Sequence, residues 1–185
     1  MAGLDLDRYL KTEKQKSFEY DFCKDAEIYE VWDEIVIGEE YDSTRAFEIK
    51  KEDMTSYAES VLDDNPLYHD EEFAAKSHFG RLIPHPLFLV LIAFYCIDKG
   101  KCSWIRSPGA MNPGQRIAMH EPFKVGEIIS VKQKSYDKWI KRNKHFVTYQ
   151  LDYYNQKGTL KGTWWITLIL PPTREELLKH ADLGR

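Results

Sequence analysis

The feature that most constrains this chain is one apolar segment, residues 84–98, after which only candidate strands follow. From Leu87 to Tyr95 every side chain is apolar or aromatic, and this pattern predicts a helix that is buried on every side. Pro86 suits the first turn of such a helix, and Gly100 suits its end. The apolar run stops at Ile97, too early for a membrane-crossing helix of about 20 residues.

Alternating apolar and polar residues predict four strands after this helix. The expected strands cover residues 115–123, 128–141, 145–155 and 159–170. Turn-forming residues separate the last three, at Arg142 to Lys144 and at Asn155 to Gly158. A buried helix before a run of antiparallel strands packs most economically under a curved sheet. The pattern therefore predicts an α+β fold in which the sheet wraps around the helix.

The rest of the chain predicts an arm, shorter elements and a tail around a single domain. Residues 1–25 are polar and periodic and favour an N-terminal helical arm, residues 26–172 form the expected domain, and residues 173–185 form a short C-terminal helix and tail. Three short elements are expected before the buried helix: a strand at residues 44–49, and helices at 52–62 and 71–77. Acidic residues in the first turn favour the helix at 52–62.

The composition is that of a globular protein in a reducing compartment. Of 185 residues, 43% are hydrophobic and 30% charged, the profile of one folded domain. The net charge of −4 argues against a nucleic-acid partner, which would require a basic face. Cys23, Cys96 and Cys102 form no CxxC pair, so free thiols are expected. Because residues 1–17 are charged throughout, we expect no signal peptide and no membrane partner, and a cytoplasmic location.

Two stretches around the apolar segment carry family motifs. The first reads Asp63-Asp-Asn-Pro-Leu-Tyr-His-Asp70, then Phe73-Ala74, then Phe79-Gly-Arg-Leu-Ile-Pro-His85, and the second reads His120-Glu-Pro-Phe-Lys-Val-Gly-Glu127. Together they resemble the MaoC-like dehydratases and type-2 (R)-specific enoyl-CoA hydratases, over most of the chain. The form of the first motif is most similar to the N-terminal dehydratase halves of that family. The resemblance implies a hotdog fold, an antiparallel sheet around one long buried helix.

The resemblance also implies a site. In the family, an aspartate and a histidine hold and activate a water that adds to an enoyl thioester. A backbone N–H at the start of the buried helix meets the thioester oxygen. When the motif is aligned on Asn65-Pro66, the family aspartate falls on Asp63 and the family histidine on Tyr68. His69 stands one residue later, and Asp64 and His69 keep the family spacing in a shifted register.

Asp63, Asp64 and His69 are therefore the candidate catalytic residues. The expected substrate-binding residues are those around the same loop and the helix start: Asn65, Tyr68, His85, Leu87 and Phe88. The family His-Gly pair falls on His85-Pro86, and because proline has no N–H, the usual oxyanion donor is missing there. The N–H of Leu87 could replace it only if the turn were displaced. Asp63 also suits a turn, His69 a solvated loop, and Tyr68 an aromatic pocket wall.

Three functions are open on this basis. The chain is a hydratase or dehydratase of acyl-CoA or acyl-carrier-protein thioesters, acting as one subunit of a homodimeric or heterodimeric double hotdog. Alternatively, it is a non-catalytic subunit that binds the acyl thioester beside a catalytic hotdog partner. A thioesterase shares the fold but does not need the Asp63–Pro66 loop. No metal and no cofactor are expected, because the histidines lack metal-ligand spacing.

Overall fold

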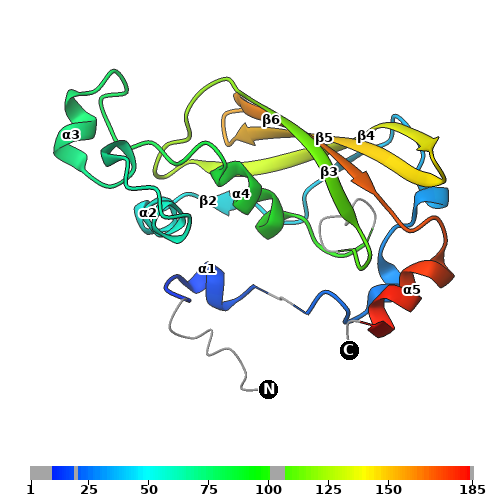
Figure 1. The fold of residues 1–185 in the computed structure, drawn as a ribbon. Coiled ribbons are helices and arrows are strands. Elements are labelled where there is room, and N and C mark those ends of the chain that lie inside the picture. Colours follow the sequence, from blue (N-terminus) through cyan, green and yellow to red (C-terminus); the bar gives the residue numbers. More distant parts are fainter. Residues whose placement is uncertain (1–9, 19–20, 101–106, 184–185) are drawn as a thin grey trace.

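The computed structural model describes residues 10–18, 21–100 and 107–183. The described residues form one antiparallel sheet in the order β1-β4-β5-β6-β3, and β2 also pairs with β4. Its strands are β1 (Glu40–Asp42), β2 (Phe47–Glu48), β3 (Met111–Met119), β4 (Ile128–Lys141), β5 (Lys144–Asn155) and β6 (Leu160–Ile169). Figure 1 shows helix α4 (Phe88–Cys96) lying against one face of this sheet. The predicted α+β hotdog arrangement is thereby confirmed.

Both predicted hairpin turns are present. Between β4 and β5, Lys141 pairs with Lys144, and the two residues between them have φ values of 50° and 57°. Positive φ at both central residues is the geometry of a type I′ turn, whose twist matches that of paired strands. Between β5 and β6, the side-chain oxygen of Asn155 accepts the backbone N–H groups of Lys157 and Thr159, both at 3.0 Å.

The core lies between α4 and the sheet. Alternate residues of β4, β5 and β6 point toward the helix, as the period-2 pattern predicts. The largest buried side chains of this layer include Phe88, Tyr149, Tyr153 and Trp164. However, α4 is not buried on every side: Phe88 and Leu89 are fully buried, whereas Leu87 is 40% exposed and Val90, Leu91, Phe94 and Tyr95 are half-buried. Two cavities described below lie along this less buried side, and Val90, Leu91, Phe94 and Tyr95 line one or both of them.

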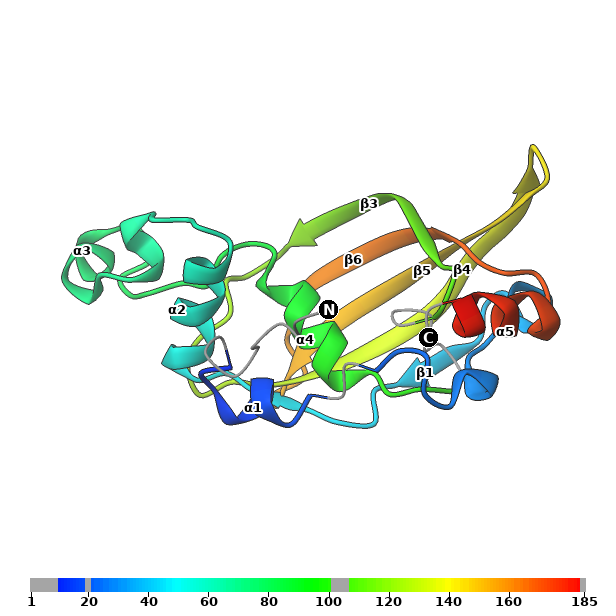
Figure 2. The same ribbon diagram turned by 60° about the horizontal axis from the view of Figure 1, so that its bottom comes forward.

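The remaining helices lie at the two ends of the sheet. Helices α2 (Lys51–Ser60) and α3 (Glu71–Lys76) and a 3-10 turn, Pro66–Tyr68, lie beyond one end, and α5 (Arg174–Leu183) lies near the other (Figure 2). Helix α5 packs on the 3-10 helix Ala26–Ile28 through a small separate core that includes Tyr29 and Leu177. A further 3-10 helix covers Trp32–Glu34.

Several expected elements differ from the observed ones. The described part of the N-terminal arm has one helical turn, α1 (Glu13–Lys16), rather than a helix over residues 1–25, and residues 1–9 and 19–20 of the expected arm lie outside the described residues. The strand expected at residues 44–49 is shorter in the structure and corresponds to β2 alone. Strand β1 was not predicted. Both strands are short and depend on pairing with β4, so the local sequence pattern does not define them.

Strand β3 begins at Met111 rather than at residue 115. The sequence Pro113-Gly114 argues locally against a strand. It is tolerated because β3 lies at the edge of the sheet and has an irregular register between Met111 and Gly114. Helix α4 ends at Cys96, where the following residue turns extended, and not near Gly100. Cys96 is a buried free thiol, whereas Cys102 lies outside the described residues.

Within the described ranges, no helix has both the length and the apolar character needed to span a membrane.

Candidate functional site

The loop that carries Asp63 is set by the way α2 ends. Leu62 has a left-handed φ of 57°, and its N–H donates to the carbonyl of Glu59 while the N–H of Asp63 donates to that of Ala58. This pair of bonds is a Schellman motif, the usual C-terminal cap of a helix, with a leucine where glycine is preferred. The chain is thereby turned sharply just before Asp63, so the helix ends by its cap before it reaches Pro66.

Side-chain caps then hold the motif loop in one shape. Asp63 Oδ1 accepts the N–H of Asn65 at 3.1 Å, and Asn65 Oδ1 accepts the N–H of Leu67 at 3.1 Å. Pro66 opens the 3-10 turn, where a missing N–H costs nothing. Asp70 caps α3 by accepting the N–H of Phe73 at 3.0 Å. Asn65 therefore shapes the loop, and its carbonyl oxygen is already bonded to the main chain.

Asp63 lies between two histidines. The ring of His85 brings Nε2 to 3.5 Å from Asp63 Oδ2, and both side chains are partly shielded, at 17% and 34% exposure. The ring of His69 places Nε2 2.8 Å from the backbone oxygen of Asp63. The sequence suggested a pair between Asp64 and His69, but His69 bonds the main chain of Asp63 instead, and Asp64 is exposed.

The proton positions on these rings follow from their partners. The N–H of Leu87 donates to His85 Nδ1 at 3.0 Å, so the neutral ring carries its proton on Nε2 and directs it toward Asp63. In His69, a backbone oxygen accepts from Nε2, so the lone pair is on Nδ1. The N–H of Leu87, which could replace the missing oxyanion donor only if the turn were displaced, donates to His85 instead.

Tyr68 forms the wall behind this pair. Its side chain is only 7% exposed, and its ring contacts that of His85 edge-on at a centroid distance of 5.6 Å. Burial raises the pKa of the Tyr68 phenol, and the negative charge of Asp63 raises it further. The phenol therefore keeps its proton at neutral pH and is able to donate a hydrogen bond.

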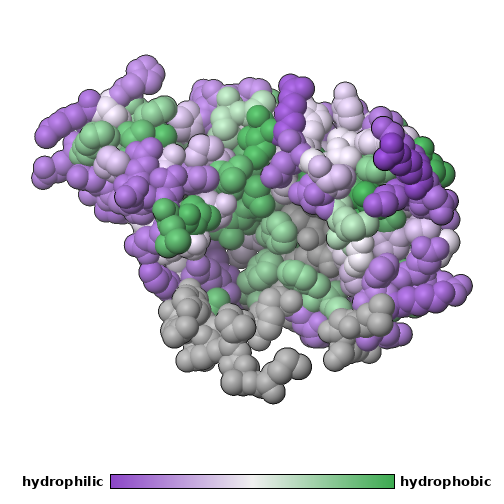
Figure 3. All heavy atoms as spheres, in the orientation of Figure 1, coloured by the Kyte–Doolittle hydropathy of each residue, from purple (hydrophilic) through white to green (hydrophobic). Residues whose placement is uncertain are grey.

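Two hollows adjoin the site. A shallow one contains Asp63, Asp64 and His69, so the three candidate catalytic residues do share one surface depression. A cavity of about 440 Å³ lies between α4 and the strands β3 and β6, lined by Leu87, Tyr57 and Trp164 among others. This cavity falls in the size range of ligand pockets, about 300–1,000 Å³. Hydrophobic residues gather near the middle of the molecular face drawn in Figure 3.

Tyr57 links the polar pair to the cavity. Its ring lies 5.7 Å from that of His85 and also lines the cavity. The sequence analysis missed this residue, although its place on the inner side of the amphipathic helix at 52–62 was a usable signal. Phe88, expected to bind substrate, is fully buried and packs edge-on against Tyr57 and Phe47. Phe88 therefore lies in the core, behind the cavity wall, and Leu87 is the residue that lines the cavity.

The described residues contain no group of three or more histidine, cysteine, aspartate or glutamate side chains arranged to hold a metal ion. The site consists of one carboxylate, two imidazoles and two tyrosine rings beside an apolar cavity. Such a set can transfer protons and donate hydrogen bonds.

Known proteins share both the sequence pattern and the fold. The family model of the FAS1-like dehydratase domain region matches residues 35–160, more than half of the chain. A UPF0336 protein of Saccharopolyspora erythraea is 25% identical over 151 residues, which cover 78% of this chain and 94% of that protein. The 3-hydroxybutyryl-CoA dehydratase of Methylorubrum extorquens is 31% identical over 85 residues, 46% of this chain and 52% of the relative.

Among solved structures, the HadBC (3R-hydroxyacyl-ACP dehydratase) complex of Mycobacterium tuberculosis has the same fold. The TM-score is 0.65 at 20% sequence identity, and the match covers 74% of this chain and 98% of that one. The MaoC-like dehydratase of Rhodospirillum rubrum also shares the fold, with a TM-score of 0.64 at 20% sequence identity over 76% of this chain and 96% of that one. The sheet-on-helix architecture, the loop motif and the family match agree. This chain belongs to the FAS1-like dehydratase domain family.

Proposed function

We propose that this chain is a subunit of a hydratase or dehydratase that acts on acyl thioesters. The Asp63–His85 pair supports this most directly, because His85 contacts Leu87 and Tyr57, and both of these residues line a cavity of substrate size. A carboxylate that accepts a proton, N–H and O–H groups that donate, and an apolar wall for the acyl chain are what the reaction requires.

The chemistry assigns a role to each group. In hydration, Asp63 Oδ2 accepts a proton from a water held by His85 Nε2–H, and the water oxygen bonds to the β-carbon of the enoyl thioester. The electron pair of the double bond moves to the thioester oxygen as an enolate, which the Tyr68 phenol is suited to stabilise. The proton on Asp63 then passes to the α-carbon, which restores the carboxylate and releases the hydroxyacyl thioester. Dehydration runs through the same steps in reverse.

The base in this scheme is the carboxylate and not His85. Both nitrogens of His85 are engaged, since Nδ1 accepts from Leu87 and Nε2 faces Asp63. His69 has its lone pair on Nδ1 and adjoins the exposed hollow, so it is the alternative base.

A second function is favoured by one specific bond. The N–H of Leu87 donates to His85 Nδ1, so it is not free to stabilise a thioester oxyanion. A chain without that donor suits a non-catalytic role, in which it binds the acyl group while a hotdog partner supplies the chemistry. Strand β3 is an edge strand whose residues are mostly exposed, and such an edge is a surface for pairing with a second sheet. The two functions thus share the expectation of a dimer.

A steady-state hydration assay with crotonyl-CoA and two longer enoyl-CoAs tests the catalytic proposal on the purified full chain. Asp63→Asn and His85→Gln should each lower kcat/KM by about 10²-fold or more. His69→Ala measures the alternative base. Glu72→Gln, at an exposed carboxylate on α3 outside the candidate site, is the matched control and should stay within about twofold, since it removes no described side-chain contact.

The outcomes separate the candidates. Turnover that Asp63→Asn abolishes supports the enzyme. No turnover, together with measurable binding of saturated acyl-CoA, supports the binding subunit. Release of free CoA from a saturated acyl-CoA would identify a thioesterase, and absence of both binding and turnover for every thioester would refute the proposal. Light scattering that gave the 21.8 kDa monomer mass at micromolar concentration would contradict the dimer.

A further inference from the structure

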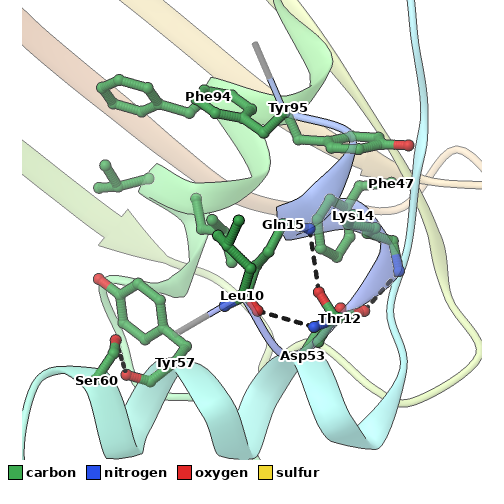
Figure 4. A pocket seen from close by; sticks show the side chains of 13 residues that line it. Leu10, Thr12, Lys14, Gln15, Phe47, Asp53, Tyr57, Ser60, Phe94 and Tyr95 are labelled. Atoms are coloured by element: carbon green, nitrogen blue, oxygen red, sulfur yellow. Dashed lines mark hydrogen bonds and ion pairs between the residues drawn. The ribbon is translucent and has the colours of Figure 1, made fainter. Parts of the chain in front are cut away.

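A second cavity lies on the outer side of α4, beneath the N-terminal arm. Its volume is about 390 Å³. The arm contributes Leu10, Thr12, Lys14, Gln15 and Phe18 to the wall, and α2 and α4 contribute the opposite side. Figure 4 shows Tyr57 from α2 and Phe94 and Tyr95 from α4 around the space that Leu10 and Gln15 help to close. These arm residues precede residues 35–160, so the wall includes chain outside the family domain.

Thr12, Gln15 and Ser60 of this wall already make hydrogen bonds within the protein. Thr12 Oγ1 accepts the N–H of Gln15, and Gln15 Oε1 accepts the N–H groups of Lys11 and Thr12. Ser60 Oγ donates to the carbonyl of Tyr57 at 2.7 Å. A wall whose polar groups are used in this way offers few contacts to a polar ligand, while its leucine, valine and aromatic side chains favour an apolar one.

The arm is held in place by ion pairs to α2. Lys14 Nζ lies 2.6 Å from Asp53 Oδ2, with the two side chains only 17% and 3% exposed, and it also lies over the Phe47 ring at 4.7 Å. A second pair, between Lys11 and Glu59, is exposed. Because an unpaired buried carboxylate is costly, the Lys14–Asp53 pair favours the closed position of the arm.

The two cavities are neighbours. Tyr57, Val90 and Phe94 line both of them. Val90 and Phe94 are four residues apart and therefore lie one above the other on the same side of α4, and both are half-buried. A shift of these side chains would join the cavities into one channel that starts next to His85, because Tyr57 also contacts that ring.

We propose that the cavity under the arm receives the distal end of a long acyl chain, with the arm as its closing wall. The inference rests on the proposed function: the thioester head lies at Asp63 and His85, and the tail passes Tyr57 and Phe94. The ligand class is then an acyl thioester long enough to extend beyond the first cavity. Each methylene that leaves water on binding raises affinity about fourfold. Lengthening the chain from octanoyl to dodecanoyl should therefore raise affinity on the order of 100-fold.

Calorimetric binding of butanoyl-, octanoyl- and dodecanoyl-CoA to the full chain tests this without requiring turnover. Leu91→Trp should fill the cavity under the arm, because Leu91 lines that cavity and does not line the one between α4 and the strands β3 and β6. It should reduce dodecanoyl-CoA affinity to about that of octanoyl-CoA and leave butanoyl-CoA within about twofold. Leu178→Trp is the matched control, since Leu178 is 37% exposed on α5, away from both cavities. Ser60→Trp fills the same space from an exposed position and serves if Leu91→Trp does not fold.

The arm itself is tested by Lys14→Met. Loss of the pair with Asp53 should weaken dodecanoyl-CoA binding at least fivefold more than butanoyl-CoA binding. Lys16→Met, which breaks only the exposed pair with Glu13, should change neither.

The binding results can refute this inference separately from the proposed function on which it rests. Equal affinity for all three lengths in the wild-type chain, or equal losses for all lengths in Leu91→Trp, would overturn the arm cavity as an acyl site while the proposed function stands. Free dodecanoate that bound as tightly as dodecanoyl-CoA would overturn the connection to the thioester site. Failure to bind any acyl-CoA would refute the proposed function together with this inference.

Discussion

Lys161 is the side chain whose removal should destabilise the fold most clearly. It lies on β6 with its ammonium fully buried, 3.0 Å from Glu127 Oε1 and 3.2 Å from Glu121 Oε2. Both carboxylates belong to the motif at residues 120–127, and the Lys161 carbonyl accepts the N–H of Glu121 at 3.1 Å. The lysine thus joins this motif to β6, the strand next to the edge strand β3.

The expected loss follows from what Lys161→Met leaves behind. Removing one member of a buried ion pair costs about 3–5 kcal/mol, because the other charge remains without its partner. For Lys161→Met we expect a cost at the lower end of this range. Glu121 is 53% exposed and regains water, and Glu127 keeps bonds from Asn155 and from the N–H of Lys124. Methionine fills most of the space of the lysine stem. We expect a loss of about 3 kcal/mol, or roughly 6–12 °C in Tm for a chain of this size.

Urea denaturation and calorimetry at neutral pH measure this loss. Lys179→Met is the control, because its pair with Glu175 is exposed on both sides and its loss should leave the urea midpoint nearly unchanged. The double variant Lys161→Met/Glu127→Gln should recover at least about 1 kcal/mol relative to Lys161→Met, since no buried charge is then left unpaired. A Lys161→Met protein within about 1 kcal/mol of wild type would refute this reasoning.

Three further predictions concern acid stability, the loop and a thiol. Burial acts to raise the pKa of Glu127, but hydrogen bonds from Asn155 and Lys161 outweigh it and leave the pKa below its ordinary 4.5. The stability from this group is therefore present above pH 4.5 and lost as the pH falls below it, so urea midpoints should drop more steeply there in wild type than in Glu127→Gln. Leu62 is left-handed and 91% exposed, so Leu62→Gly should stabilise by up to about 1 kcal/mol in the same urea assay, and a loss would show that its side chain matters. Burial raises the pKa of the Cys96 thiol to about 12. Iodoacetamide at pH 8 should therefore label Cys96 only in urea, and mass mapping that found it labelled in the folded chain would contradict this.

The long strands were predictable because several local signals agree there. In β4, β5 and β6 the apolar period, the strand-forming residues and the turn residues all indicate the same hairpins. The short strands β1 and β2 carry no such pattern, since they exist through pairing with β4. The burial of α4 was overestimated because an apolar residue on the helix surface says nothing about what covers it. Leu91 and Phe94 face a cavity, which only the positions of the arm and α2 reveal.

The site was predictable as a loop but not as a set of contacts. The Asx turns of Asp63 and Asn65 follow from local sequence, because each bond joins residues two positions apart. The pairing of Asp63 with His85 joins two segments that meet only in the folded chain. The contact between His85 and Tyr57 has the same origin.

The two departures from the family pattern are linked through His85. Tyr68 occupies the position that the family motif gives to a histidine. Its ring is buried, so no imidazole is present at that position. His85 packs on that ring and supplies an imidazole to Asp63 from the start of α4. In the tautomer that presents Nε2–H in that direction, His85 accepts a hydrogen bond at Nδ1, and the N–H of Leu87 donates it. The N–H of Leu87 is therefore used to orient the histidine. If the chain acts on acyl thioesters as proposed, that N–H is not available to a thioester oxyanion, and catalysis at this site then needs the Tyr68 phenol or a group from a partner subunit as the donor.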